Sequence, residues 1–144
     1  MEEGSRILVP VDGSDASDRA VEMGAYLAQQ AGFALDLLFV SAFDAGTDAE
    51  DEHAWLPSWA AGSTKKKQER VLGRAQSHVP AGMTAACHSR SGIPADEILK
   101  FAEAEQTGLI VIGGGGVSPV EGFLLGSVSQ DVVNRSTTTV LVVK

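Results

Sequence analysis

The sequence has little cysteine, few aromatic residues and no long apolar stretch. Cys87 is the single cysteine among 144 residues, so no disulfide can form within the chain. The three histidines, His53, His78 and His88, show no metal-ligand spacing, and we therefore predict no metal site. No apolar run approaches the ~18 residues that a membrane-spanning helix needs, which argues against a membrane protein.

Basic residues are also scarce. The chain has 11 lysines and arginines against 19 acidic residues, and its formal net charge is −8. This balance argues against a nucleic-acid-binding protein and against a polybasic membrane anchor. The first residues are acidic and lack the basic and apolar regions of a signal peptide, so we expect a cytoplasmic protein. The length predicts one domain over residues 1–144, with enough apolar residues for a packed core.

Short apolar runs alternate with helical patterns along the chain. Four runs of valine, isoleucine and leucine predict strands, and a weaker pattern predicts a fifth; they are Ile7–Val11, Leu35–Val40, Leu109–Ile112, Val140–Val143 and Met83–Arg90. Continuous apolar runs are typical of strands that are buried on both faces. The alternation predicts an α/β fold: one doubly wound, Rossmann-like, five-stranded parallel sheet with helices on both faces.

Four helices are expected between these strands. The first is capped by Ser14 and stopped by Gly32, and the second covers about Lys65–His78. The third has Pro94 in its first turn, and the last begins near Ser127. We expect the later three helices to bury Val71, Leu72, Ala75, Ile98, Leu99, Phe101, Ala102, Val128, Val132 and Val133.

Residues 44–62 fit neither a strand nor a helix and are interpreted as a surface loop. The loop begins with five acidic residues and no basic one, and continues with Trp55-Leu56-Pro57-Ser58-Trp59. The two tryptophans allow two interpretations, a plug on the core or a lid over a binding site. Cys87 is interpreted as an unreactive strand residue, and His88 is expected to point to the other side of that strand.

Two loops follow expected strands at the edge where open α/β sheets bind ligands. Asp12-Gly13-Ser14 follows the first strand, and four glycines, Gly113–Gly116, follow the fourth. Backbone amides in a glycine-rich turn and at the start of the next helix, at Gly126-Ser127, are typical of a phosphate site. No lysine or arginine lies between Phe101 and Asn134, which excludes a Walker A loop, and a dinucleotide-binding fingerprint also fails because its glycines would follow the first strand.

The glycine spacing that does fit is G-x-x-G, nine residues, then G-S, at Gly113, Gly116, Gly126 and Ser127. With this motif, the opening Ile7–Ser14, the Gly92-Ile93-Pro94 turn and the ending Val140–Val143, the chain resembles the universal stress protein family, in its ATP-binding branch. The resemblance covers nearly all of the chain except the loop. It implies a regulatory, stress-responsive dimer that is formed through the last strand, 137–143, and that acts on an unidentified protein partner.

The resemblance also implies a site for ATP, ADP or AMP, with Mg²⁺ as a possible companion. Asp12 would accept hydrogen bonds from the ribose hydroxyls, and the remaining predicted nucleotide-binding residues are Pro10, Val11, Val40, Ile112, Gly113, Gly116, Gly126, Ser127, Val128 and Ser129. No catalytic residues are assigned. The alternatives to nucleotide binding are a slow ATPase that uses the same pocket and a dimeric interaction module whose pocket is empty.

The glycine loop departs from the family pattern in one important respect. Where members commonly read Gly-Ser-His-Gly-Arg-Gly, this chain has four glycines followed by Val117-Ser118, so the basic side chain is absent. Pro119 and Glu121 replace the usual small and basic residues that follow. We therefore expect weaker triphosphate binding than in a typical member, or a preference for fewer phosphates.

Overall fold

Strands and helices alternate along the chain in the computed structural model, which describes residues 5–42, 58–114 and 126–144. The elements are β1 (Arg6–Val11), α1 (Asp15–Ala31), β2 (Ala34–Ala42), α3 (Ser58–Ser77), β3 (Ala85–Gly92), α4 (Pro94–Ala104), β4 (Thr107–Gly113), α5 (Ser127–Arg135) and β5 (Thr139–Val143). No helix in these ranges is both long and apolar enough to cross a membrane.

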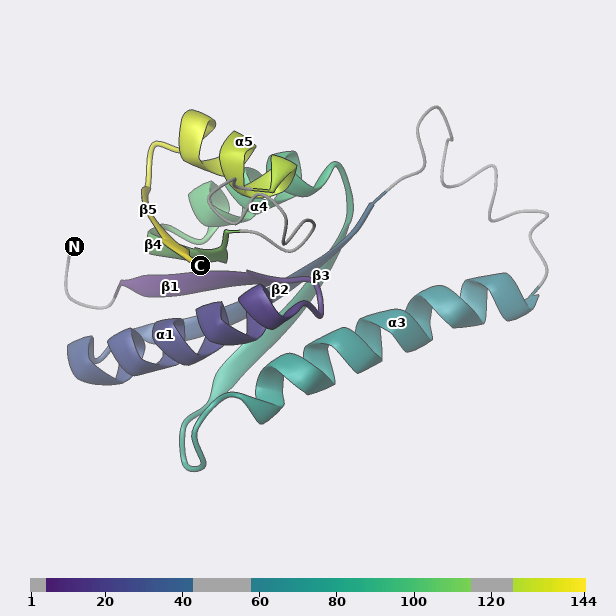
Figure 1. Ribbon diagram of the computed structural model, residues 1–144, viewed down its shortest axis with the longest axis horizontal. Coiled ribbons are helices and arrows are strands. Elements are labelled where there is room, and N and C mark those ends of the chain that lie inside the picture. Colours follow the sequence, from purple (N-terminus) through teal and green to yellow (C-terminus); the bar gives the residue numbers. More distant parts are fainter. Residues whose placement is uncertain (1–4, 43–57, 115–125) are drawn as a thin grey trace.

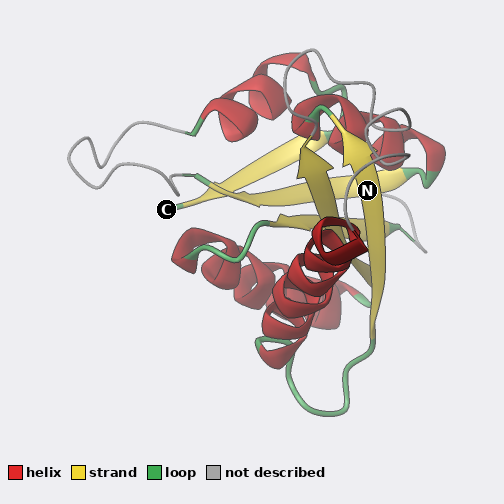
Figure 2. Ribbon diagram, turned by 90° about the vertical axis from the view of Figure 1, so that its right-hand side faces the viewer, coloured by secondary structure: helices red, strands yellow, loops and turns green. Residues whose placement is uncertain are grey.

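The five strands form one parallel sheet in the order β3-β2-β1-β4-β5. Helices α1 and α3 cover one face and helices α4 and α5 the other, as Figures 1 and 2 show. The predicted fold class is therefore confirmed. From β1 the chain builds the sheet first in one direction, through β2 to β3, and then in the other, through β4 to β5. The point at which the strand order reverses is therefore between β1 and β4.

Both faces of the central strands are buried, which explains why their sequences are continuously apolar. In β1, Ile7 and Val9 pack beneath α1, whereas Leu8 packs on the opposite face among residues of α4 and α5. The close approach of α1 depends on Gly24, since a Cβ there would lie 2.6 Å from Val9 Cγ2. The predicted ends of α1 are confirmed. The Ser14 hydroxyl accepts a hydrogen bond from the Ser17 amide at the start of the helix, and Gly32 ends the helix with its backbone in the left-handed conformation.

Two predictions about the helices need correction. Helix α3 begins at Ser58, not near Lys65, so the expected loop over 44–62 is helical at its end. Trp55 lies outside the described residues, as does the side chain of Trp59, and the plug and lid interpretations both stay predictions. The expected burial of Val133 is wrong: it is 40% exposed because it lies on the outer side of α5, whereas its neighbour Val132 is fully buried.

A charged cluster lies under α4 at the amino ends of β1 and β2. The Asp36 side chain is 0% exposed, and it accepts two hydrogen bonds of 2.7 Å from Arg6. His88 Nε2 lies 2.9 Å from Asp36 Oδ1. Burial by itself would raise the pKa of Asp36, but the hydrogen bonds from Arg6 and His88 outweigh it and hold the pKa below the usual range.

Cys87 and His88 are neighbours in edge strand β3. The His88 side chain meets Asp36 and Phe101 on the α4 side of the sheet, whereas the Cys87 thiol is free. Partial burial raises the pKa of the Cys87 thiol. A raised pKa keeps sulfur in the less reactive protonated form, as expected for an unreactive strand residue.

Candidate functional site

A cavity of about 170 Å³ opens at the carboxyl ends of the central strands. It is lined by Pro10, Val11, Asp12, Ser14, Ser17, Leu38, Val40, Pro94, Ile98, Ile112, Gly113, Gly126, Ser127, Val128 and Ser129. All of the predicted nucleotide-binding residues are in this set except Gly116, which lies outside the described residues. Val117, Pro119 and Glu121 lie outside them as well. The cavity sits at the reversal of strand order, where open α/β sheets bind ligands.

One side of the cavity is apolar. Leu38 and Val40 come from the second half of β2, Ile112 from the end of β4, and Ile98 from α4. These side chains belong to the core on the α4 side of the sheet, so their positions are fixed by packing. The sequence prediction missed Leu38 and Ile98 as lining residues, although it identified both as apolar positions of a strand and a helix.

The other side is polar and begins with Asp12, where β1 turns into α1. The Ser14 amide donates a 2.9 Å hydrogen bond to Asp12 Oδ1, and the Asp12 amide donates a 3.2 Å bond to Ser17 Oγ. Together with the bond from the Ser17 amide to Ser14 Oγ, these contacts fix the turn. Within the described part of the chain, Asp12 Oδ2 has no hydrogen-bond partner, and the carboxylate is exposed. It is therefore positioned to accept a hydrogen bond from a ligand.

The start of α5 supplies the second polar group of the cavity. Its N-cap residue is Gly126, so no side chain caps the helix, and the amides of Ser127, Val128 and Ser129 have no partner within the helix. The Gly126 amide itself donates to Gly114 O at 2.9 Å. Free first-turn amides and the positive end of the helix dipole favour an anion at this position.

The structure changes the expected role of Ser129. Its hydroxyl is buried and donates a 2.7 Å hydrogen bond to Gly113 O, which fastens α5 to the end of β4. The predicted site included Ser129 as a hydroxyl donor to phosphate, but that proton is already engaged. Ser127 is different, because its side chain is exposed at the cavity.

Gly113 is required by packing within the protein. A Cβ at this position would lie 2.7 Å from the Ala16 carbonyl carbon and 2.9 Å from the Ser17 nitrogen. The sequence interpretation gave the glycine run the role of letting the backbone approach a ligand. For Gly113 the structure shows a backbone contact with α1 instead, and the Gly114 amide donates to Val143 O in β5.

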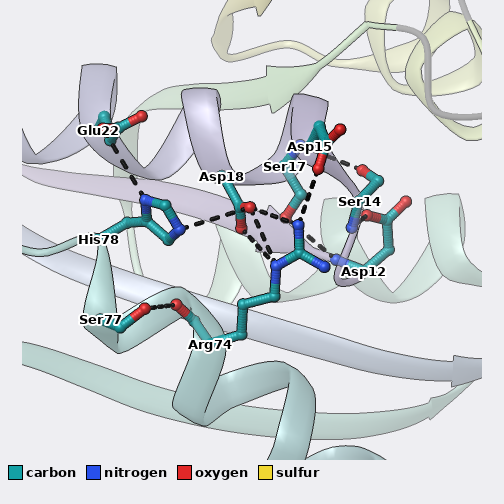
Figure 3. A network of polar contacts seen from close by, with 9 residues as sticks. All are labelled: Asp12, Ser14, Asp15, Ser17, Asp18, Glu22, Arg74, Ser77 and His78. Carbon is teal, nitrogen blue, oxygen red and sulfur yellow. Dashed lines mark hydrogen bonds and ion pairs between the residues drawn. The ribbon is translucent and has the colours of Figure 1, made fainter.

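A charged network that the sequence analysis missed connects α3 to the first turn of α1 (Figure 3). Arg74 Nη2 lies 2.6 Å from Asp18 Oδ2 and 3.0 Å from Asp15 Oδ1, and Arg74 Nε also donates to Asp18 at 3.0 Å. These interactions, led by the hydrogen bond to Asp18, raise the pKa of Arg74. His78 extends the network, with Nε2 3.4 Å from Asp18 and Nδ1 3.8 Å from Glu22.

A metal centre is not evident among the residues that the structure describes. Within residues 5–42, 58–114 and 126–144, no three histidine, cysteine, aspartate or glutamate side chains are grouped so that they could hold a metal ion. Asp12 is the one charged residue in the described lining of the cavity. The chemistry that this lining offers is therefore an apolar slot, one acceptor carboxylate and a set of amide donors.

Comparison with known proteins identifies the class to which this fold and cavity belong. The model of the Universal stress protein family matches residues 4–144, and the chain is a member of this family. It is 31% identical to universal stress protein YxiE of Bacillus subtilis over 146 residues, which cover 97% of this chain and 99% of YxiE.

Two solved structures support the same assignment. The structure of MJ0577 from Methanocaldococcus jannaschii has a TM-score of 0.74 and 28% identity, and the match covers 97% of this chain and 95% of MJ0577. A universal stress protein in complex with cAMP has a TM-score of 0.66 and 27% identity, with 99% of each chain covered.

Proposed function

We propose that this universal stress protein binds an adenine nucleotide in the cavity between β1 and β4 and acts as a regulatory dimer in the stress response. The observation that carries the proposal is the juxtaposition of three features in one cavity: an apolar slot, the free oxygen of Asp12 and the uncapped start of α5. The relative in complex with cAMP supports an adenine nucleotide as the ligand class.

Each part of a nucleotide has a matching group. The base fits the apolar side, between Val40 and Ile112, and the ribose hydroxyls donate to Asp12 Oδ2. A phosphate accepts hydrogen bonds from the Ser127 hydroxyl and from the first-turn amides of α5, including that of Ser129. Gly116 keeps its predicted phosphate role as part of this proposal.

The charge of the cavity favours a ligand with few phosphates. Asp12 is negative, and no lysine or arginine is found in the described lining. Helix amides supply only partial positive charge. A triphosphate would therefore gain less here than in a site with a cation, unless Mg²⁺ accompanies it, and we expect AMP to bind at least as tightly as ATP without metal.

Dimerisation through residues 137–143 follows from the sheet order. Strand β5 lies at one edge of the sheet, and its residues Val140–Val143 are half-buried in the single chain. An edge strand of this kind has backbone groups that can pair with a second copy, which would make a twofold contact. Sedimentation at micromolar concentration tests this part of the proposal, and a monomer would contradict it. We further propose that the dimer acts on another protein.

The decisive experiment is identification of small molecules released from freshly purified protein, followed by calorimetric titration with AMP, ADP and ATP. Asp12→Ala is expected to weaken AMP binding about tenfold or more, because it removes a charged acceptor of the ribose hydroxyls. Asp131→Ala is the matched control, since Asp131 is an exposed acid of α5 that does not line the cavity.

Three other outcomes would change the proposal. If wild-type protein binds no adenine nucleotide with or without Mg²⁺, the alternative of an interaction module with an empty pocket replaces it. If ATP binds far more tightly than AMP without metal, the expected phosphate count is wrong. Multiple turnover of ATP that disappears in Asp12→Ala would make the protein a slow ATPase.

A further inference from the structure

Three carboxylates lie in the segment from Asp12 to Asp18, which forms one rim of the cavity at the start of α1. Asp12 lines the cavity, whereas Asp15 and Asp18 do not line it but follow the lining residues Ser14 and Ser17 and bond Arg74 of α3. The Asp15 side chain is 88% exposed, and that of Asp18 is 13% exposed. Without compensation, this rim would repel an anionic ligand.

Arg74 supplies the compensation from a different element. Its guanidinium lies within 3.0 Å of oxygens of both Asp15 and Asp18, and Figure 3 shows it between the first turn of α1 and helix α3. It is not among the residues that line the cavity. Any effect of Arg74 on a ligand therefore acts through the two aspartates and through the local field.

From this arrangement we infer that Arg74 is a positioning residue that sets the charge of the rim and so allows the cavity to accept a nucleotide phosphate. The inference rests on the proposed nucleotide binding and adds a determinant of ligand charge to it. It also explains how the site tolerates two acidic residues next to its lining: one of their two negative charges is balanced by a residue that is 56 positions away from Asp18 in the sequence.

Arg74 also has a structural role, because it holds Asp15 and Asp18 of the first turn of α1 against α3. The hydrogen bonds that fix the Asp12 turn are made by Ser14 and Ser17 of the same segment. If Arg74 only stabilised the local structure, its loss would change the affinity for every ligand of the cavity alike. A charge-setting residue affects anionic ligands more than neutral ones, and the two roles can therefore be separated by ligand charge.

The test compares AMP with adenosine, which has the same base and ribose but no phosphate. At low salt, Arg74→Gln is expected to raise the dissociation constant of AMP about three- to fivefold, which is the effect that a unit charge exerts on a dianion over roughly 10 Å in a water-like dielectric. Binding of adenosine is expected to change less than about twofold, because adenosine has no net charge and the charge of the rim hardly affects it. The AMP effect should shrink at about 0.5 M salt, where the screening length falls to a few ångströms.

Two further variants make the test specific. Arg74→Lys keeps the positive charge but loses the bidentate hydrogen bonding of the guanidinium. It should therefore keep the AMP-to-adenosine affinity ratio of wild-type protein. Asp15→Asn in the Arg74→Gln background removes one negative charge and should restore part of the lost AMP affinity. Lys100→Gln is the charge-matched control, because Lys100 is 75% exposed on α4 and pairs with Glu97, so its loss removes the same charge without touching Asp15 or Asp18. All titrations use one pH, so that the charge of His78 beside Asp18 and Glu22 is constant.

The outcomes separate this inference from the proposed function. If wild-type protein binds neither ligand, the proposed function fails and the inference falls with it. If wild-type protein binds AMP and Arg74→Gln weakens AMP and adenosine equally, with no dependence on salt and no recovery in Asp15→Asn, Arg74 is only a brace and the inference alone is wrong. No change in either affinity would overturn it too.

Discussion

At the amino ends of β1 and β2, the Asp36 carboxylate is bonded by Arg6 and His88 within the protein, whereas at the carboxyl end of β1 the Asp12 carboxylate has an oxygen that faces a cavity. Asp36 is fully buried, and Asp12 is exposed. A carboxylate thus stabilises the fold at one end of the sheet, and a second carboxylate is available to a ligand at the other end.

The helix ends show the same difference. The start of α1 is capped by Ser14, and its acidic residues are paired with Arg74. The start of α5, which faces the cavity, has no side-chain cap. In the described residues, an oxygen of Asp12 and the first amides of α5 are left without a protein partner beside the same cavity, an arrangement typical of a binding site.

The largest expected effect comes from breaking the amino-end cluster. Arg6→Met leaves the buried Asp36 carboxylate with His88 alone, and we expect a loss of about 2 to 3 kcal/mol in the free energy of unfolding. This lies at the low end for buried pairs, because the Arg6 side chain is 35% exposed. Denaturant unfolding of the purified protein measures it.

Two controls sharpen this prediction. The double variant Arg6→Met/Asp36→Leu should recover most of the stability, because it removes the buried charge as well as its partner. Asp12→Ala at the other end of the sheet should change stability by less than about 0.5 kcal/mol while it weakens AMP binding. Equal losses of stability in Arg6→Met and Asp12→Ala would contradict the proposed division between the two ends.

The next effect concerns the glycine that lies beneath α1. Gly113→Ala places a Cβ within van der Waals overlap of the Ala16 and Ser17 backbone, and we expect it to cost about 1 to 3 kcal/mol. Gly73→Ala is the matched control, because Gly73 lies in α3 with no atom within 4 Å of the added Cβ, and alanine there should stabilise the helix by roughly 0.8 kcal/mol. Thermal unfolding of both variants should shift in opposite directions; a neutral Gly113→Ala would show that the helix is free to move.

Much of this molecule follows from local patterns in its sequence. The continuous apolar run of β1, the serine cap and the glycine stop of α1 each act over a few residues, and the structure has all of them as predicted. The cavity was located because turns after parallel strands meet at one edge of the sheet, so Asp12 and Gly113 come together although they are far apart in sequence.

The features that were missed depend on contacts between distant segments. Asp36 interrupts an apolar run, and only the fold brings Arg6 and His88 to it, 30 and 52 residues away. Arg74 reaches α1 in the same way. The start of α3 was missed because residues 58–64 include Gly62 and three small polar residues, which give no apolar stripe of helical period.

A smaller effect separates two serines of α5. Ser129→Ala removes the buried bond to Gly113 O and is expected to cost about 1 kcal/mol of stability. Ser127→Ala removes an exposed hydroxyl, so it should leave stability within about 0.5 kcal/mol and weaken AMP binding instead. Unfolding and calorimetry on both variants check this, and a loss of stability in Ser127→Ala alone would reverse the two assigned roles.

The smallest effect is the dependence of stability on pH between neutral and mildly acidic conditions. Because the pKa of Asp36 is lower in the folded protein than in the unfolded chain, its contribution is fully present above the unfolded pKa and is lost as the pH falls through the folded pKa. Wild-type stability should therefore vary little, by less than about 1 kcal/mol, between pH 7 and 5 as far as this group is concerned. In Arg6→Met, burial is no longer offset by the guanidinium, so the pKa of Asp36 rises and the loss begins at higher pH. Unfolding curves at several pH values test the sign: an onset in Arg6→Met at the same pH as in wild-type protein would mean that His88 alone keeps the buried carboxylate charged.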